Sequence, residues 1–149
     1  MSSRRVFLTK RQLEVLRLRL QGHTQAAVAS SLKTTRENVA VVERRARRNV
    51  QRAVYTLLTY LELSCKTKVE LKKGESPTLA AKKVLREASS LGIKLKDHLP
   101  ELAQLLLKVS GEENGKLKRD VVVYISARGS VSMISLGGDE EFTLFATFG

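Results

Sequence analysis

Apolar residues recur at helical spacing soon after the start of the chain, and polar capping residues bound them on both sides. The pattern predicts a first helix over about 10–20. Thr9 precedes it as an N-cap with Gln12 in capping-box position, and Gly22 follows it as a left-handed C-cap. The apolar stripe expected to face the core comprises Leu13, Val15, Leu16 and Leu20.

Two further helices follow with a tight turn between them. The second is predicted from about Gln25 to Leu32 and the third from Arg36, with the turn at 33–35. Small Ala29 suits a close crossing of two helices. The spacing of the apolar residues predicts one shared core formed by Val28, Leu32, Val39 and Val42.

The turn between these helices leaves two local questions. Lys33 occupies a position where such turns often carry glycine for a positive φ, so we expect lysine to adopt that conformation at some cost. Either threonine after it can cap the third helix, because Thr34 has Glu37 at the capping-box offset and Thr35 has Asn38.

Arginines crowd the third helix, and a helical wheel separates them from its apolar side. At about 100° per residue, Val39, Val42 and Ala46 face the first two helices, whereas Val41 and Arg44 lie on the opposite side. An apolar Val41 is unusual at the centre of a solvated face. It suits a face that enters a DNA major groove, where valine can contact a thymine methyl group.

The pattern changes in the second half of the chain. Alternation predicts a short strand over 66–72, and helical stripes follow Ser76-Pro77 and again Asp97 to Pro100. A polar loop is expected at 111–115. Strands over 121–126, 131–136 and 141–148 then predict an antiparallel β-meander, with the two helices covering one face.

These elements predict an α+β protein in two parts. Residues 1–62 form an all-α helix-turn-helix domain, and residues 63–149 form a small α+β domain that ends in the meander. We expect the second domain to dimerise, to sense an effector or to contact the transcription machinery.

Charge strengthens the case for a polyanionic partner. The 149 residues carry a formal net charge of +12. Residues 1–62 hold thirteen Lys/Arg against four acids, a net +9, whereas residues 63–149 hold fourteen against eleven, a net +3. The basic excess therefore belongs to the helix-turn-helix half and favours nucleic acid.

Donor and acceptor chemistry assigns roles to the third helix, taken as about 36–48. Arginine suits guanine, asparagine suits adenine and glutamate suits cytosine in the major groove. Helix N-termini and the remaining basic residues suit phosphates. The predicted base-reading residues are Arg36, Glu37, Asn38, Ala40, Val41, Arg44 and Arg45. The predicted phosphate-binding residues are Thr24, Gln25, Lys33, Thr34, Thr35, Arg47 and Arg48.

A short heptad-like seam continues the third helix. It consists of Val50, Val54, Leu57 and Leu61. The seam is expected either to pair two copies of the chain or to pack on the second domain. Dimerisation suits the function, because two-fold helix-turn-helix dimers read paired half-sites.

Several motifs resemble those of a known family. They are Leu8-Thr9-x-x-Gln12-x-Glu14-Val15-Leu16-x-Leu18-Arg19, Gly22-x-Thr24-Gln25, Val28-Ala29, Thr35-Arg36-x-Asn38-Val39, and Glu43-x-Arg45-Ala46 followed by Asn49. Over roughly residues 6–60 they resemble the Tfx family of archaeal DNA-binding transcriptional regulators. That region is similar in turn to the DNA-binding helices of sigma factors and LuxR-type regulators. The resemblance implies a sequence-specific regulator with a smaller α+β C-terminal domain; Lys33 departs from the pattern.

Other classes of function are less well supported. An arginine-rich helix also suits an RNA- or ribosome-associated protein. An enzyme is not expected, because no nucleophile, acid/base pair or metal cluster joins His23, His98 or Cys65, and we expect neither a metal nor another cofactor. The single cysteine and the absence of a signal pattern or long apolar run favour a cytoplasmic protein that does not enter a membrane. RNA polymerase or the general transcription machinery is a further partner that this function implies.

Overall fold

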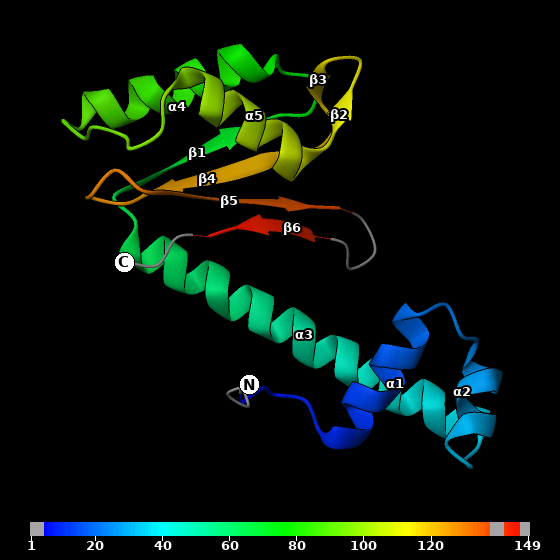
Figure 1. The fold of residues 1–149 in the computed structure, drawn as a ribbon. Helices are drawn as coiled ribbons and strands as arrows, with labels where there is room; N and C mark the ends of the chain where they lie inside the picture. Colours follow the sequence, from blue (N-terminus) through cyan, green and yellow to red (C-terminus); the bar gives the residue numbers. More distant parts are fainter. Residues whose placement is uncertain (1–4, 138–141, 147–149) are drawn as a thin grey trace. The chain divides into compact units, whose positions relative to one another are not determined.

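The computed structural model describes residues 5–137 and 142–146. The chain divides into two compact units, Met1–Leu57 and Leu58–Gly149. Helices dominate the first unit, and a sheet with covering helices makes up most of the second (Figure 1). The fold is therefore α+β, as predicted. The boundary falls within the third helix, five residues before the predicted end of the first domain.

The first helix, α1 (Lys10–Leu20), is bounded by the predicted caps. The Gln12 backbone N–H donates to Thr9 Oγ1 at 3.1 Å, and the Thr9 N–H donates to Gln12 Oε1 at 3.0 Å. Gly22 follows the helix with φ +94°, the left-handed conformation that glycine adopts without strain. Both ends of α1 are thus fixed by local chemistry.

The helices of the first unit share one small core. Its buried aliphatic residues are Val15, Val28, Ala29 and Val39, with Leu18, Leu32 and Val42 packed against them. This confirms the shared core of the second and third helices. The predicted stripe on α1 is wrong in part, because Leu13 and Leu20 are 45% and 76% exposed. The helix has leucines on several sides, and the side that faces inward carries Val15 and Leu18.

A strained turn joins α2 (Gln25–Ser31) to α3 (Arg36–Ser64). Lys33 has φ +53°, as the expected positive φ requires, and the Thr34 N–H donates to the Ala29 carbonyl at 2.9 Å. Thr35 caps α3, because its Oγ1 accepts from the Asn38 N–H at 3.1 Å. The helix then continues for 29 residues without a break.

A four-stranded antiparallel sheet forms the second unit. Its strands are β1 (Thr67–Leu71), β4 (Val121–Ile125), β5 (Val131–Leu136) and β6 (Phe142–Phe145), in the order β1-β4-β5-β6. The meander is therefore extended by β1, whose Val69 lies opposite Val123 of β4. The last predicted strand was too long at its C-terminal end, because Ala146 lies outside β6, and its residues 141 and 147–148 lie outside the described residues.

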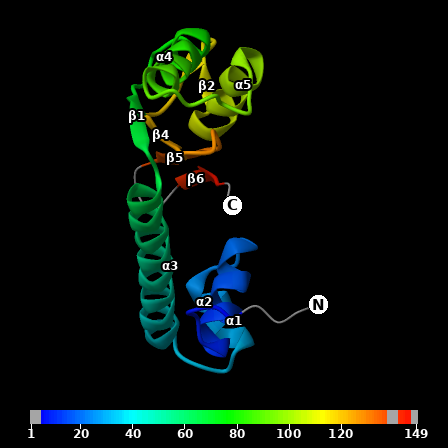
Figure 2. The same ribbon diagram turned by 90° about the vertical axis from the view of Figure 1, so that its left-hand side faces the viewer.

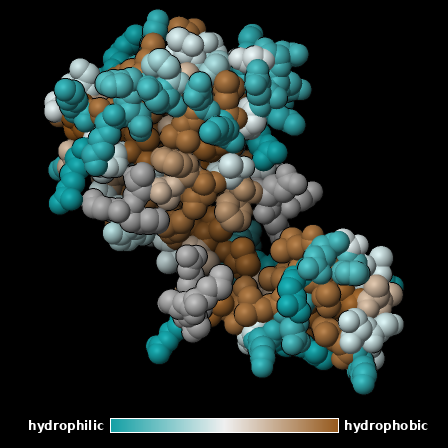
Figure 3. All heavy atoms as spheres, in the orientation of Figure 1, coloured by the Kyte–Doolittle hydropathy of each residue, from teal (hydrophilic) through white to brown (hydrophobic). Residues whose placement is uncertain are grey.

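Two helices cover one face of this sheet, as predicted. Both α4 (Pro77–Ser90) and α5 (Leu99–Ser110) lie on the same side of the strands in the two views (Figures 1 and 2). Ser76 caps α4 through the Leu79 N–H, and hydrophilic residues predominate over the outer surface of this helix pair (Figure 3). The core between helices and sheet includes Leu71, Val84, Leu102, Leu106, Val123 and Met133.

One segment that we expected to be a loop forms a small hairpin. Strands β2 (Glu112–Glu113) and β3 (Lys116–Leu117) pair antiparallel through a turn at Asn114-Gly115. Both turn residues have positive φ, +53° and +73°, which is the conformation of the type I′ turn that favours Asn-Gly. None of the helices in the described part of the chain is long and apolar enough to cross a membrane.

Candidate nucleic-acid interface

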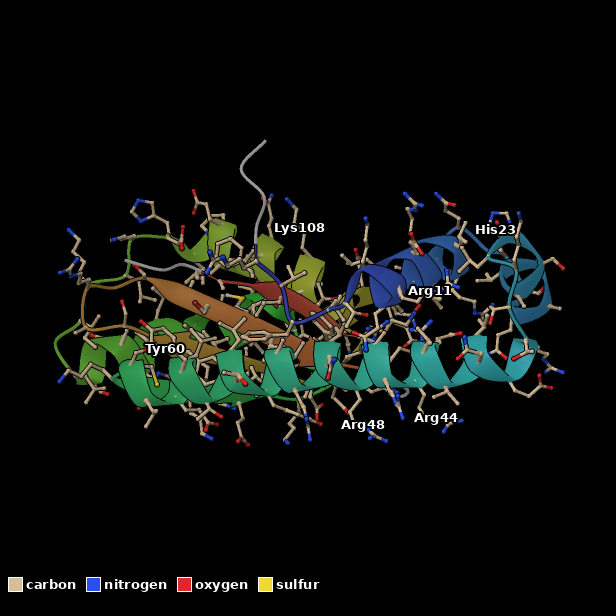
Figure 4. All side chains as sticks on the ribbon, turned by 90° about the horizontal axis from the view of Figure 1, so that it is seen from below. Arg11, His23, Arg44, Arg48, Tyr60 and Lys108 are labelled. Carbon is tan, nitrogen blue, oxygen red and sulfur yellow. The ribbon has the colours of Figure 1, made fainter. Side chains whose placement is uncertain are left out.

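The N-terminal half of α3 separates its residues into an inner and an outer side. Val39 and Ala46 are buried at 1% and 0% exposure, whereas Arg44 and Arg48 are exposed. Both arginines project from the side of α3 opposite α1 (Figure 4). We call this side the outer face. Its exposed residues are Arg36, Glu37, Asn38, Arg44, Arg45 and Arg48, with Ala40 and Val41 half-buried.

The arginines of the outer face are not paired with acids in the described part of the chain. Across residues 5–137 and 142–146, Arg36, Arg44, Arg45 and Arg48 form no ion pair. Four guanidinium groups within about three and a half turns of helix raise the local positive potential, and like charges at this spacing repel. An anion lying against this face would reduce that repulsion.

Asn38 is the outer-face residue whose side-chain amide already has a partner. Its Nδ2 donates to Thr34 Oγ1 at 3.0 Å, next to the capping bond from its own backbone to Thr35. Because Nδ2 has a second hydrogen and Oδ1 two lone pairs, the amide keeps hydrogen-bonding capacity for a base. The bond to Thr34 holds the Asn38 side chain at the N-terminal end of α3.

A buried glutamate joins the three helices, and our sequence-based prediction gave it no role beyond the family resemblance. Glu43 is 6% exposed, on the inner side of α3. Its Oε2 accepts from Arg19 Nε of α1 at 2.8 Å and from Gln25 Nε2 of α2 at 3.2 Å. Its Oε1 accepts from Arg47 Nε at 3.2 Å. The carboxylate therefore bonds to side chains of all three helices.

The environment of Glu43 keeps it ionised. Burial by itself raises the pKa of a carboxyl group, but the hydrogen bonds from Arg19, Gln25 and Arg47 favour the charged form. The pKa of Glu43 is lowered overall. Arg19 also donates from Nη1 to the His23 carbonyl at 2.7 Å, just before α2. This ionic cluster fixes the angle at which α3 presents its outer face.

The predicted phosphate-binding residues divide into two groups. Thr24, Thr34 and Thr35 lie at the N-termini of α2 and α3, and exposed Lys33 lies in the turn before α3. Gln25 and Arg47 are half-buried and bonded to Glu43 instead. Arg48 lies on the outer face, about 18 Å along α3 from Arg36, so the structure does not bring it to the helix N-termini where the first group lies.

The predicted dimer seam varies in exposure within a single chain. Val50, Val54 and Leu57 are half-buried, whereas Leu61 is only 5% exposed. The last turns of α3 also carry an ion pair to the sheet, because Lys68 Nζ lies 3.4 Å from Glu62 Oε1. Leu61 therefore already has neighbours in one copy of the chain.

The other titratable candidates lie on different elements of the chain. His23 precedes α2, and His98 precedes α5. Burial raises the pKa of the Cys65 thiol, which favours its uncharged form. In the part of the chain that the structure describes, no three His, Cys, Asp or Glu side chains gather as a metal ligand set.

The chain thus combines a basic N-terminal unit of helices with a four-stranded α+β unit, and the comparisons place it in the class of DNA-binding transcriptional regulators. Residues 53–133 match the family described as "DNA_binding protein, TFX, C-term". The chain is 34% identical over 124 residues to a "Putative transcriptional regulatory protein" of Pyrococcus horikoshii, covering 83% of this chain and 87% of that protein. It therefore belongs to the Tfx family.

Two further archaeal relatives extend the comparison. A "Putative transcriptional regulatory protein" of Methanocaldococcus jannaschii is 31% identical over 129 residues, covering 85% of this chain and 94% of the relative. The "DNA-binding protein Tfx" of Methanothermobacter thermautotrophicus is 35% identical over 91 residues, covering 61% of this chain and 66% of the relative.

Proposed function

We infer that this chain is a DNA-binding transcriptional regulator, and we propose that α3 reads base pairs in the major groove of double-stranded DNA. The outer face of α3 carries the proposal: its arginines are exposed and without acidic partners in the described protein. The helix diameter with side chains, about 10–12 Å, matches the major groove, about 12 Å wide. The names of the archaeal relatives support the same function.

Base reading is assigned to about the first three turns of α3. Arg36, Arg44 and Arg45 have the paired donors that match guanine O6 and N7, and Asn38 matches adenine N6 and N7. Glu37 accepts from cytosine N4, while Ala40 and Val41 contact thymine methyl groups. The half-buried position of Val41 between exposed polar neighbours suits such an apolar contact.

Phosphate binding is assigned to residues around the two helix N-termini. Thr24, Thr34 and Thr35 lie where helix dipoles attract anions, and Lys33 and Arg48 add full positive charges. Gln25 and Arg47 remain in the proposal as weaker contributors, because Glu43 already accepts hydrogen bonds from both. Such contacts set the register of the protein on DNA without reading sequence.

The wider assembly is also part of the proposal. A homodimer would present two copies of α3 to paired half-sites, with Val50, Val54 and Leu57 as the seam still partly accessible. RNA polymerase or the general transcription machinery is the expected further partner of the C-terminal unit. The protein would act in the cytoplasm, it would need no cofactor, and we do not assign it an enzymatic activity.

Competition between nucleic acids tests the proposal against an RNA-binding role. A labelled DNA duplex selected for binding is challenged with unlabelled duplex of the same sequence, with scrambled duplex, and with the matching RNA duplex. We expect the matching DNA to compete best, because the deep and narrow major groove of A-form RNA does not admit side chains. Stronger competition by RNA would refute the major-groove proposal.

A further inference from the structure

The third helix is longer than a base-reading helix requires. It spans 29 residues, which corresponds to about 43 Å at 1.5 Å per residue. The major groove is only about 12 Å wide. A helix whose N-terminal turns contact bases must therefore pass the edge of the groove, where phosphates are the available DNA groups.

The arginine row continues along that extension. Arg52 follows Arg45 by seven residues, which is two helical turns and a rotation of only about 20°. Arg48 lies between them, within about 60° of both. Arg45, Arg48 and Arg52 are all exposed. They form one row on the side of α3 from which Arg48 projects in Figure 4.

The height of Arg52 along the helix places it past the groove. With Val41 at the groove centre, Arg45 lies about 6 Å along the axis, Arg48 about 10.5 Å and Arg52 about 16.5 Å. Half the groove width is only about 6 Å. Arg52 therefore lies about 10.5 Å beyond the edge of the groove, where base edges are out of reach and the sugar–phosphate backbone is the available DNA group.

The ion pairs of the protein separate two kinds of arginine on α3. Arg47 faces inward and bonds to Glu43 at 3.2 Å. Arg52 has no acidic partner across residues 5–137 and 142–146, and Glu43 and Glu62 are the nearest acids on its own helix. An exposed arginine next to other unpaired arginines is repelled by them unless an anion lies against the row.

We propose that Arg52 is a phosphate-binding residue, so that the DNA-binding surface of α3 extends along the row Arg45–Arg48–Arg52 beyond the base-reading turns. This inference rests on the proposed function and adds a flanking contact to it. The contact is ionic and carries no base preference. It lengthens the footprint on the side of the site toward which the C-terminus of α3 points.

Salt dependence of binding measures this contact. Each phosphate neutralised by Lys or Arg contributes about 0.9 to the slope of log affinity against log salt. Arg52→Gln and Arg52→Lys are compared with wild type on a mixed-sequence duplex of about 30 base pairs and on a duplex selected for binding. Arg86→Ala is the matched control, because Arg86 is an exposed arginine on α4 of the other unit.

We expect Arg52→Gln to lower the slope by about 0.9 on both duplexes. Between 50 and 200 mM salt, the loss of affinity of wild type should therefore be about 3.5 times as large as the loss of affinity of Arg52→Gln. Arg52→Lys should keep the wild-type slope, and so should Arg86→Ala. A wild-type slope for Arg52→Gln would overturn the inference. That result would leave the proposed function intact, whereas wild type that binds neither duplex would refute the function itself.

Discussion

Replacing Glu43 with glutamine removes the charge that joins the three helices while keeping the side-chain volume. The Glu43 side chain is 8% exposed, but its partners Arg19 and Arg47 are 28% and 36% exposed. Removing one partner of a fully buried ion pair costs about 3–5 kcal/mol, and an exposed pair is worth about 0–1 kcal/mol. We expect an intermediate loss of about 2 kcal/mol in the stability of the N-terminal unit, because water already screens both arginines.

Hydrogen exchange is the suitable assay, because the chain has two units and a single melting curve need not report on one of them. Backbone amides of α1 and α2 report on the N-terminal unit in the full chain. A loss of about 2 kcal/mol speeds their exchange roughly 30-fold. Glu14→Gln is the control, since Glu14 pairs with Arg11 on the surface, with side chains 38% and 44% exposed.

The effect must also depend on pH with a definite sign. The pKa of Glu43 in the folded chain lies below the ordinary glutamate value of 4.5, so its stabilisation is complete above that value. It is lost as pH falls through the lowered folded pKa. The difference in stability between wild type and Glu43→Gln, measured by amide exchange, should therefore become smaller in acid. The structural role of Glu43 would be refuted if the amides of Glu43→Gln exchanged no faster than those of Glu14→Gln. It would also be refuted if the stability difference between wild type and Glu43→Gln stayed the same in strong acid.

Two further substitutions test the backbone. Lys33→Gly should raise the stability of the N-terminal unit by about 0.5–1 kcal/mol, because Lys33 has φ +53°. If Lys33 binds a phosphate, the same substitution should also lower the slope of log affinity for DNA against log salt by about 0.9. Gly129→Ala should cost more than about 2 kcal/mol in a denaturation experiment on the C-terminal unit, because an added Cβ would lie 2.0 Å from the Lys94 carbonyl oxygen. Gly74→Ala is its control in the same unit: Gly74 has φ +88° but open space, so a loss of only about 1 kcal/mol is expected. Equal losses at both glycines would show that close packing at Gly129 is unimportant.

Local chemistry made much of the fold predictable. Several helix ends are determined by bonds and conformations within a few residues, at Thr9 with Gln12, at Gly22, and at Ser76 with Pro77. The two threonines before α3 satisfied the same spacing, and only the structure identifies Thr35 as the cap. The Asn-Gly turn at 114–115 is also a local signal, but its flanking strands are two residues long and contain a single apolar residue, Leu117, so alternation gave no indication of them.

Contacts between distant residues account for what could not be predicted. The inward side of α1 depends on packing against α2 and α3, so the leucine pattern alone misplaced Leu13 and Leu20. Glu43 lies among arginines in the sequence and resembles any solvated glutamate. Its burial follows from the approach of Arg19, 24 residues earlier, and Gln25, 18 residues earlier. Such a cluster becomes visible only when the helices are placed together.

Selection of bound duplexes from a random pool, performed with wild type and with Arg44→Ala, tests most directly whether the outer face of α3 reads bases. We expect wild type to enrich one defined site, and two-fold symmetry of that site would indicate a dimer. We expect Arg44→Ala to lose preference at one base pair, by roughly 1–3 kcal/mol, while the remaining positions keep theirs. A wild-type pool without an enriched sequence, or an unchanged site for Arg44→Ala, would contradict base reading by this face.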